Sequence, residues 1–239
     1  LIDGVVNGCP SLLLEPQRTN LITYSEDFGN ASWSNAEDSI ITSNAIISPT
    51  GALNASLFAT GNSNNFHRIS YGIGISDATT YTHSVFVKKQ NYNYFSFRYN
   101  LGGSGYGNVT FDINEGNLIY NGLNCVANIE NYGNDWYRCS ISFTSTGTTG
   151  TVLYYTSLTP LTTNTIVSYI GNDLDGVYIF GTQLEESSYP TSYIPTSGST
   201  VTRSAETATG AGDATTFNDS EGVLMAEIAF DSNDGSFKI

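Results

Sequence analysis

The sequence predicts an all-β protein built as an antiparallel β-sandwich. Apolar and polar residues alternate along many short segments, and nowhere do apolar residues keep helical spacing for more than one turn. Clusters of glycine, asparagine, serine and aspartate separate these segments. Only 13% of the 239 residues are charged, whereas tyrosine alone contributes 16 residues. This composition is typical of short strands joined by polar turns.

Six segments combine this alternation with many aromatic and β-branched residues, which favour the pleated surface of a sheet. They are, in chain order, 81–88 (YTHSVFVK), 92–99 (YNYFSFRY), 107–113 (GNVTFDI), 136–144 (WYRCSISFT), 151–157 (TVLYYTS) and 176–184 (GVYIFGTQL). Turn-forming clusters stand between several of them. Because no helical segment separates the strands, we expect two facing antiparallel sheets.

The strand pattern divides the chain into parts. Pro190, Pro195 and a Ser/Thr/Gly-rich stretch at 196–216 interrupt it and indicate a linker. An apolar strand at 222–230 then begins a hairpin, which needs a partner sheet because an isolated hairpin is barely stable in water. The expected parts are an N-terminal connector at 1–19, the sandwich at 20–203, and at 204–239 the linker and the hairpin of a truncated second β domain or an assembly arm.

The charge and hydropathy of the chain exclude two classes of partner. Eight cationic and 22 acidic residues give a net charge of −14, which repels phosphate backbones and anionic lipid headgroups. No run approaches the roughly 18 apolar residues of a membrane-spanning helix. The start, Leu1-Ile2-Asp3-Gly4, lacks an initiator Met and a basic leader, which indicates a fragment or processed piece. We expect neither nucleic-acid binding nor membrane insertion.

Three cysteines, Cys9, Cys125 and Cys139, do not make a complete disulfide framework, and no Cys-x-x-Cys motif or Cys/His cluster occurs. Cys125 and Cys139 can pair if their strands adjoin, because a disulfide needs a Cα separation of about 5.5 Å. We favour the alternative, in which both are buried free thiols that pack as small apolar side chains.

Landmarks along the chain resemble, in their order, those of the jelly-roll carbohydrate-binding modules. They are Asn20-Leu21, Glu26-Asp27-Phe28, Trp33, the 81–88 strand, Trp136-Tyr137-Arg138-Cys139, Asp175-Gly176-Val177-Tyr178-Ile179 and Gln183-Leu184-Glu185. The resemblance implies a jelly-roll sandwich that binds carbohydrate.

Three further blocks resemble a domain common in bacteriophage tail-fibre and head-fibre proteins. They are Glu15-Pro16-Gln17-Arg18-Thr19-Asn20, the segment 188–196 (SYPTSYIPT) and Thr202-Arg203-Ser204-Ala205. This resemblance covers roughly 12–206, and 188–196 is its most specific element. It implies a virion surface protein that contacts other virion proteins and adheres to glycans of the bacterial envelope. A second sandwich, similar to concanavalin-type lectin domains, often follows in such proteins.

The 92–99 segment supplies the candidate glycan site. Its alternation places Tyr92, Tyr94, Ser96 and Arg98 on one face, while the phenylalanines occupy the core face. Aromatic platforms beside forked donors suit sugar rings, whose C–H faces pack on aromatics and whose hydroxyls need hydrogen bonds. His67 follows an Asn-rich loop and is expected to add a polar rim to the same groove. In the alternative interpretation, these tyrosines contact a neighbouring subunit.

The resemblance to carbohydrate-binding modules also implies one metal ion. Asp175 matches the acidic residue before the last long strand of carbohydrate-binding modules, where that family commonly holds a structural calcium, and the 172–175 loop offers several oxygens. The carboxylate that such modules carry just after the early aromatic is replaced here by Gly29. An exposed acidic turn is therefore the alternative, and no cofactor is expected to be required.

Other conspicuous residues are expected to serve structure. His83 alternates with valines and predicts a hydrogen-bonded core histidine. Trp33 and Trp136 are expected to plug the ends of the sandwich. The acidic pairs Asp112 with Glu115 and Glu185 with Glu186 are expected at turns without the apolar environment that raises one pKa of a hydrolase pair, so the chain is predicted not to be an enzyme.

The sequence therefore predicts a phage virion surface protein, from a tail or head fibre, with a glycan-binding jelly roll. Apolar strands in the flanks 1–14 and 207–239 lack a sheet to join, which favours a homo-oligomer, with a trimer as the expected state. Two alternatives remain. One is a purely structural fibre segment, and the other is an accessory module of a secreted polysaccharide-degrading enzyme.

Overall fold

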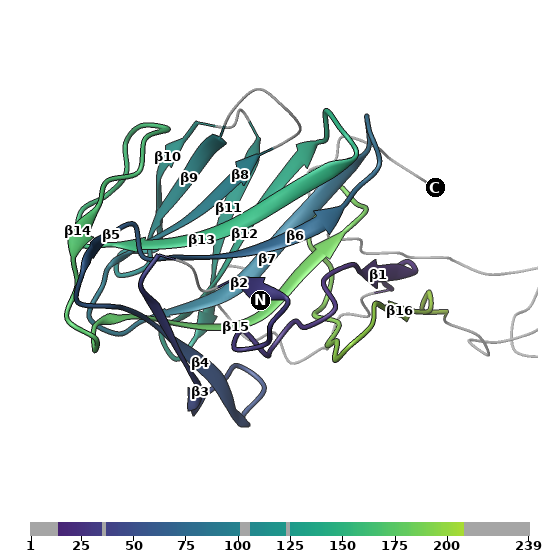
Figure 1. Cartoon of the computed structure of the whole chain (residues 1–239). Coiled ribbons are helices and arrows are strands. Elements are labelled where there is room, and N and C mark those ends of the chain that lie inside the picture. The colour runs from purple at the N-terminus through teal and green to yellow at the C-terminus, as the bar shows by residue number, and fades with distance from the viewer. Residues whose placement is uncertain (1–13, 35–36, 101–105, 123–124, 208–239) are drawn as a thin grey trace, which may run out of the picture. The chain divides into compact units, whose positions relative to one another are not determined.

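Two six-stranded antiparallel sheets lie face to face and form the body of the protein (Figure 1). Sheet I has the order β10-β9-β8-β13-β6-β2, and sheet II has the order β11-β12-β7-β15-β4-β3. The strands of sheet I are β2 (Trp33–Ser34), β6 (Arg68–Gly74), β8 (Tyr94–Asn100), β9 (Tyr106–Asp112), β10 (Asn117–Asn121) and β13 (Thr149–Ser157). The strands of sheet II are β3 (Ser39–Ile47), β4 (Leu53–Thr60), β7 (Thr80–Lys89), β11 (Val126–Gly133), β12 (Trp136–Thr144) and β15 (Gly176–Glu185).

Two short strand pairs accompany the sandwich. They are β1 (Arg18–Asn20) with β16 (Val201–Arg203), and β5 (Asn64–Asn65) with β14 (Tyr169–Ile170). The computed structural model describes residues 14–34, 37–100, 106–122 and 125–207. Within these ranges the protein contains no helix, and hence no helix long and apolar enough to cross a membrane. The predicted hairpin at 222–239, the N-terminal flank up to residue 13 and Cys9 lie outside the described residues.

The chain groups into two units. The first unit, Thr19–Thr202, contains the sandwich, and the second combines Leu1–Arg18 with Arg203–Ile239. In the second unit, Arg203 forms an ion pair with Glu15 (2.6 Å), and the backbone N–H of Glu206 donates to the carbonyl of Glu15 (2.9 Å). The division into a connector, a sandwich and a truncated second domain remains a prediction.

The prediction of an all-β sandwich is confirmed. The six predicted strands correspond to β7, β8, β9, β12, β13 and β15, with bounds within two residues. The chain crosses repeatedly between the layers, from β6 in sheet I to β7 in sheet II, back to β8, β9 and β10, then to β11 and β12, to β13, and finally to β15. This is the connectivity of a jelly roll.

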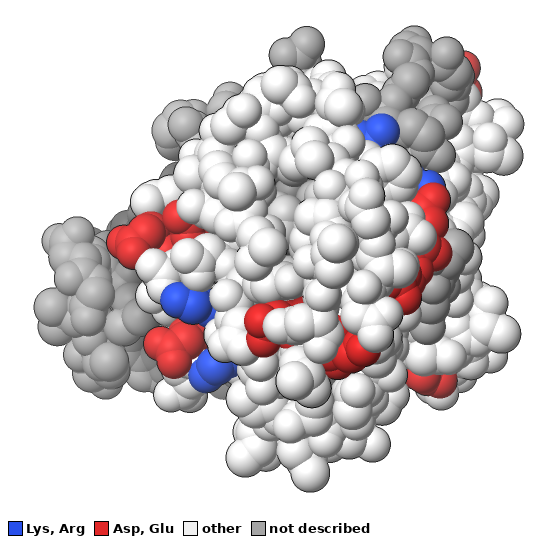
Figure 2. Space-filling model, turned by 60° about the vertical axis from the view of Figure 1, so that its left-hand side comes forward, with Lys and Arg blue, Asp and Glu red and all other residues white. Residues whose placement is uncertain are grey.

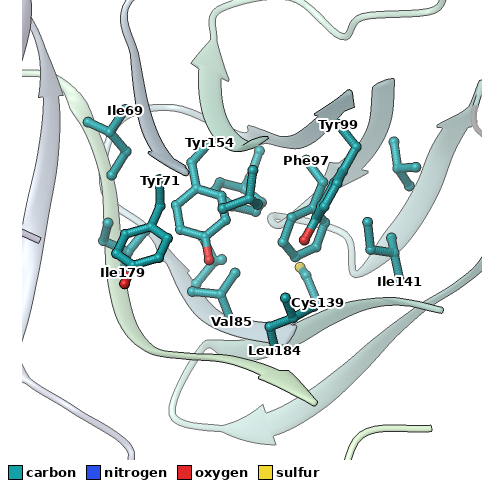
Figure 3. Packing of buried hydrophobic residues seen from close by; sticks show 14 of the residues in the cluster. Ile69, Tyr71, Val85, Phe97, Tyr99, Cys139, Ile141, Tyr154, Ile179 and Leu184 are labelled. Carbon is teal, nitrogen blue, oxygen red and sulfur yellow. The ribbon is translucent and has the colours of Figure 1, made fainter. Parts of the chain in front are cut away.

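The core lies between the sheets and is rich in aromatic residues. Phe97, Tyr99 and Tyr154 of sheet I extend toward Val85 and Cys139 of sheet II (Figure 3). The ring of Tyr154 lies 5.7 Å from that of Phe97, in the edge-on geometry that aromatic pairs prefer. Each of these five residues is almost completely buried, so the hydrophobic effect of large side chains stabilises the two-layer arrangement.

His83 is the polar centre of this core. Its Nδ1 lies 2.6 Å from the hydroxyl of Tyr99, and its Nε2 lies 2.8 Å from that of Tyr154 and 2.9 Å from the hydroxyl of Thr182. Burial lowers the pKa of His83 to about 3, so the imidazole is neutral at pH 7. The prediction of a hydrogen-bonded core histidine is confirmed.

The tryptophans and the described cysteines are packing residues. Trp33 packs against Phe28 at 5.1 Å between ring centroids, and Trp136 belongs to a second apolar cluster with Phe86 and Phe180. Cys125 and Cys139 are both free thiols, as the sequence favoured. Cys139 is completely buried, whereas Cys125 is partly buried.

The segment 188–196 is fastened to sheet II by buried polar groups. The ring of Tyr193 packs on Phe180 at 5.4 Å, and its hydroxyl bonds with the hydroxyl of Ser25 at 2.6 Å. The backbone N–H of Ile194 donates to the side chain of Gln183 (2.7 Å), and the carbonyl of Ile194 accepts from Asn20 (2.9 Å). The segment therefore completes the sandwich at the end of β15.

Candidate functional site

Tyr92 is the first residue of the predicted glycan-binding face of the 92–99 segment, but the structure does not place it on that face. Strand β8 begins only at Tyr94, so the alternation of the strand does not extend to Tyr92. The ring of Tyr92 lies in the core and is 3% exposed. Its hydroxyl bonds with the hydroxyl of Thr60 at 3.1 Å, and burial raises its pKa. The expectation that Tyr92 shares a solvent-facing surface with Tyr94 is wrong.

Ser96 and Arg98 do occupy the outer face of β8, but a covering segment, residues 158–171, lies over this face. The guanidinium of Arg98 donates to the carbonyl of Asn164 (2.9 Å), and the hydroxyl of Tyr155 donates to that of Val167 (2.6 Å). Ser96 is completely buried. The expected open groove along the Tyr94, Ser96 and Arg98 face is therefore occupied by the protein's own chain, and only Tyr94 and Arg98 remain partly exposed.

His67 ties two loops together and does not line a rim. It is completely buried, and its ring nitrogens contact the carbonyl oxygens of Asp38 and Tyr169, each at 2.8 Å. The neighbouring Arg68 forms an ion pair with Glu37. Because no atom of His67 reaches solvent, the expected role as a polar rim is wrong for this conformation.

Asp175 does not present a calcium site in this arrangement. Its two carboxylate oxygens accept hydrogen bonds from the side-chain amides of Asn91 and Asn172. The nearby carboxylate of Asp173 accepts from Asn62 at 2.6 Å. Calcium needs six to eight oxygen ligands, and in the described ranges no group of three or more His, Cys, Asp or Glu residues is placed to hold a metal. These residues do not fit the ion.

The two acidic pairs have structural roles. For one of them, the sequence predicted an environment that differs from the one in the structure. Glu185 is completely buried at the end of β15, whereas Glu186 is exposed. The expectation that Glu185 lies at a turn is wrong, because Glu185 is the last residue of β15 and the 188–196 segment covers it. The carboxylate of Asp112 accepts the backbone N–H groups of Asn114 (2.9 Å) and Glu115 (3.1 Å) and so closes the turn after β9.

A pocket of about 180 Å³ lies at the rim of the sandwich where β7 ends, and we call it the rim pocket. Three separate chain segments form it. Lys88, Lys89 and Gln90 come from the end of β7, Ile113 and Asn114 from the turn after β9, Asp135 from the turn between β11 and β12, and Tyr137 from the start of β12. Both sheets therefore contribute walls.

The two lysines are each tethered to one wall of the rim pocket. Lys88 Nζ donates to the carbonyl of Asn134 at 2.7 Å and lies 3.4 Å from the Asp135 carboxylate. Lys89 Nζ donates to the side-chain oxygen of Asn114 at 2.7 Å. An ammonium group has three N–H donors, so both lysines retain donors for a ligand.

Tyr137 gives the rim pocket an apolar wall, and Gly116 leaves room for the ring of Tyr137. Gly116 has a φ of 72°, in the left-handed region that favours glycine, and a Cβ at this position would lie 2.7 Å from the Tyr137 ring. The glycine therefore allows both the turn and the close approach of the ring.

The pairing of the lysines is unusual for this chain. Lysine occurs only three times, as Lys88, Lys89 and Lys238, and Lys238 lies outside the described residues. Figure 2 shows a face on which most residues are uncharged and acidic surface exceeds basic surface. The adjacent lysines at a strand end were a signal that could have identified this site from the sequence.

No family model and no curated protein matches the sequence. Several solved structures match this chain, and two of them match at low TM-scores. The enzymatically active domain of tailspike protein 4 from bacteriophage CBA120 is 12% identical with a TM-score of 0.38, and the match covers 69% of this chain and 21% of that one. The CBM22-1-GH10 modules of Clostridium thermocellum xylanase 10B, complexed with xylohexaose, are 14% identical with a TM-score of 0.42, over 75% and 30% of the two chains.

Proposed function

We propose that this chain is a glycan-binding jelly-roll module displayed on the surface of a bacteriophage particle, as part of a tail or head fibre. The blocks at 15–20, 188–196 and 202–205, which resemble fibre proteins in sequence, support the location. The observation that carries the proposal is that the chain enters and leaves the sandwich at one end, whereas the rim pocket lies at the other.

The attachment end is defined by contacts between the first and last residues of the sandwich. The hydroxyls of Thr19 and Thr202 lie 2.7 Å apart. The backbone N–H of Leu21 donates to the carbonyl of Leu184 at 2.8 Å, near the C-terminal end of β15. The chain therefore joins and leaves the sandwich at the same place.

The rim pocket lies at the opposite end of β15. Tyr178, near the start of this strand, pairs with Lys88 of the pocket. Strand β15 is ten residues long, and at about 3.3 Å per residue its ends are about 30 Å apart. Within the sandwich, the pocket therefore lies far from the place where the chain enters and leaves, which suits display on a particle.

The lining of the rim pocket has the chemistry of a sugar site. Tyr137 offers an aromatic wall for the C–H face of a sugar ring, the lysines donate hydrogen bonds, and Asn114 and Asp135 supply side-chain oxygens that accept them. A pocket of this size holds one sugar unit and binds it weakly. Several copies in a homo-oligomer, with a trimer as the proposed state, would add avidity.

Binding of the purified full chain to an array of bacterial envelope polysaccharides, with light scattering to measure the oligomeric state, tests the proposal. We expect saturable binding to a subset of glycans without release of reducing ends. Absence of binding to every envelope glycan would contradict the glycan-binding role, and released reducing ends would show an enzyme.

A further inference from the structure

We infer that the rim pocket binds a sugar that bears a carboxylate, such as a uronic acid or a sialic acid, and that Lys88 and Lys89 recognise the carboxylate. The inference rests on the proposed glycan-binding function and names its substrate class. It comes from the placement of charge around the pocket, where two of the three lysines of the chain meet.

The cationic side chains of the described residues divide into two groups. The five arginines all bond to other parts of the chain, as Arg68 does with Glu37, Arg98 with Asn164 and Arg138 with Thr191. The two lysines also bond to the chain, but both line the rim pocket, whose lining contains no arginine. Their ammonium groups are therefore the cations that remain accessible to a ligand in this pocket.

The two ammonium groups are held from different sides. Lys88 is tethered to the β11–β12 turn of sheet II, and Lys89 is tethered to the turn after β9 in sheet I. A carboxylate has two oxygens with several lone pairs, so it has acceptors enough for both ammonium groups. The tethers keep the lysines in place and lower the entropy lost on binding.

The charge of the rim pocket matches a singly charged ligand. Two lysines and Asp135 carry a formal charge of +1 together, and a sugar carboxylate carries −1. A phosphate monoester carries about −1.5 to −2 at pH 7, which exceeds this balance. The Tyr137 wall then packs against the ring that carries the carboxylate, a contact that a glycerol phosphate polymer does not provide.

Isothermal titration calorimetry with the full chain tests the inference. The probes are oligosaccharides of galacturonate, of glucuronate with N-acetylglucosamine, and sialyllactose, each beside its carboxyl-reduced counterpart, together with a glycerol phosphate polymer. We expect at least one acidic probe to bind about tenfold or more tightly than its reduced form, the ratio that one charge-assisted hydrogen bond supplies.

The lysines are tested with matched variants. We expect the double variant K88Q/K89Q to lose the preference for the acidic probe, K88R/K89R to retain most of it, and K238Q, which removes the charge of the one other lysine, to leave it unchanged. Circular dichroism checks that all three fold.

The outcomes separate the inference from the proposed function. Equal binding of acidic and reduced probes, tighter binding of the glycerol phosphate polymer, or an unchanged preference in K88Q/K89Q would overturn the carboxylate assignment while glycan binding stands. Absence of binding to every probe, combined with absence of binding on the envelope glycan array, would overturn both.

Discussion

The carboxylate of Glu185 accepts hydrogen bonds from both the backbone N–H of Thr191 (2.8 Å) and its hydroxyl (2.7 Å), and both residues are buried. The guanidinium of Arg138 donates to the carbonyl of Thr191 at 2.7 Å. Thr191 therefore uses all of its polar groups to fasten the 188–196 segment. The block with the most specific resemblance to fibre proteins is a structural fastening of the sandwich.

Replacing Thr191 with valine tests this fastening. The variant keeps the shape of the side chain but leaves one buried carboxylate oxygen of Glu185 without its partner. We expect a loss of about 1–3 kcal/mol in the free energy of unfolding, measured by urea denaturation. The exposed Thr162→Val is the matched control and should change stability by less than about 0.5 kcal/mol. Equal effects of the two variants would contradict the role of Glu185.

The buried, neutral His83 is expected to make the folded protein less stable in acid. Its pKa is lowered from 6.5 to about 3 in the folded protein. Between these values the unfolded chain binds a proton that the folded protein does not, so stability falls as the pH falls from 6.5 toward 3. At about 1.4 kcal/mol per pH unit, this amounts to about 3 kcal/mol between pH 7 and pH 4.

The comparison with H83Q isolates this contribution, because carboxylates and His67 are common to both proteins. We expect H83Q to be less stable at pH 7 but to lose about 3 kcal/mol less than the natural protein between pH 7 and pH 4, measured by denaturant titration at each pH. Parallel pH profiles of the two proteins would refute the neutral buried histidine.

Gly116 and Gly51 form a matched pair for testing the Tyr137 wall. Both glycines have positive φ angles, 72° and 85°, but a Cβ at Gly51 meets no atom within 4 Å. Gly51→Ala therefore measures the cost of the left-handed backbone alone, about 1 kcal/mol. We expect Gly116→Ala to cost more in thermal unfolding and to weaken glycan binding, because the Tyr137 ring must move. An identical cost for both, with unchanged binding, would contradict the close approach.

The thiols predict a distinct labelling pattern in a Cys9→Ser background. Burial raises the pKa of Cys125 to about 11 and raises that of Cys139 further, so neither is a thiolate at pH 7.5. We expect iodoacetamide to label neither residue in the native protein within minutes and to label both in denaturant without a reductant. A protein that requires reduction before labelling would contain the bridge that the structure excludes.

The core could be predicted from the sequence because the alternation of apolar and polar residues identifies the side chains on the inward face of a strand. In β8 this placed Phe95 and Phe97 in the interior, where they lie. Strand β3 escaped prediction because its register with β4 shifts between Thr42 and Ile46, so its pattern does not keep period two. Strand β11 lies at the edge of sheet II and is largely exposed, and its inward face offers only the partly buried Ala127 and Ile129 as an apolar signal.

The candidate site could not be predicted in the same way. The covering segment at 158–171 closes the outer face of β8 mainly through backbone carbonyls, such as those of Asn164 and Val167, and carbonyl positions leave no trace in a residue pattern. The rim pocket is formed by three chain segments that are far apart in the sequence. In the sequence, only the lysine pair indicates this pocket. The pair forms a pocket only together with the walls that Asn114 and Tyr137 provide.

The central claim, that the rim pocket binds glycan, is tested most directly through its lysines. Reductive methylation with ¹³C formaldehyde keeps the charge of lysine and gives an NMR signal for each of Lys88, Lys89 and Lys238, assigned with the single variants K88R, K89R and K238R. On titration with the glycan that binds most tightly on the array, we predict that the signals of Lys88 and Lys89 shift together with saturation, while that of Lys238 does not. Saturable binding that leaves the Lys88 and Lys89 signals unmoved would contradict the account.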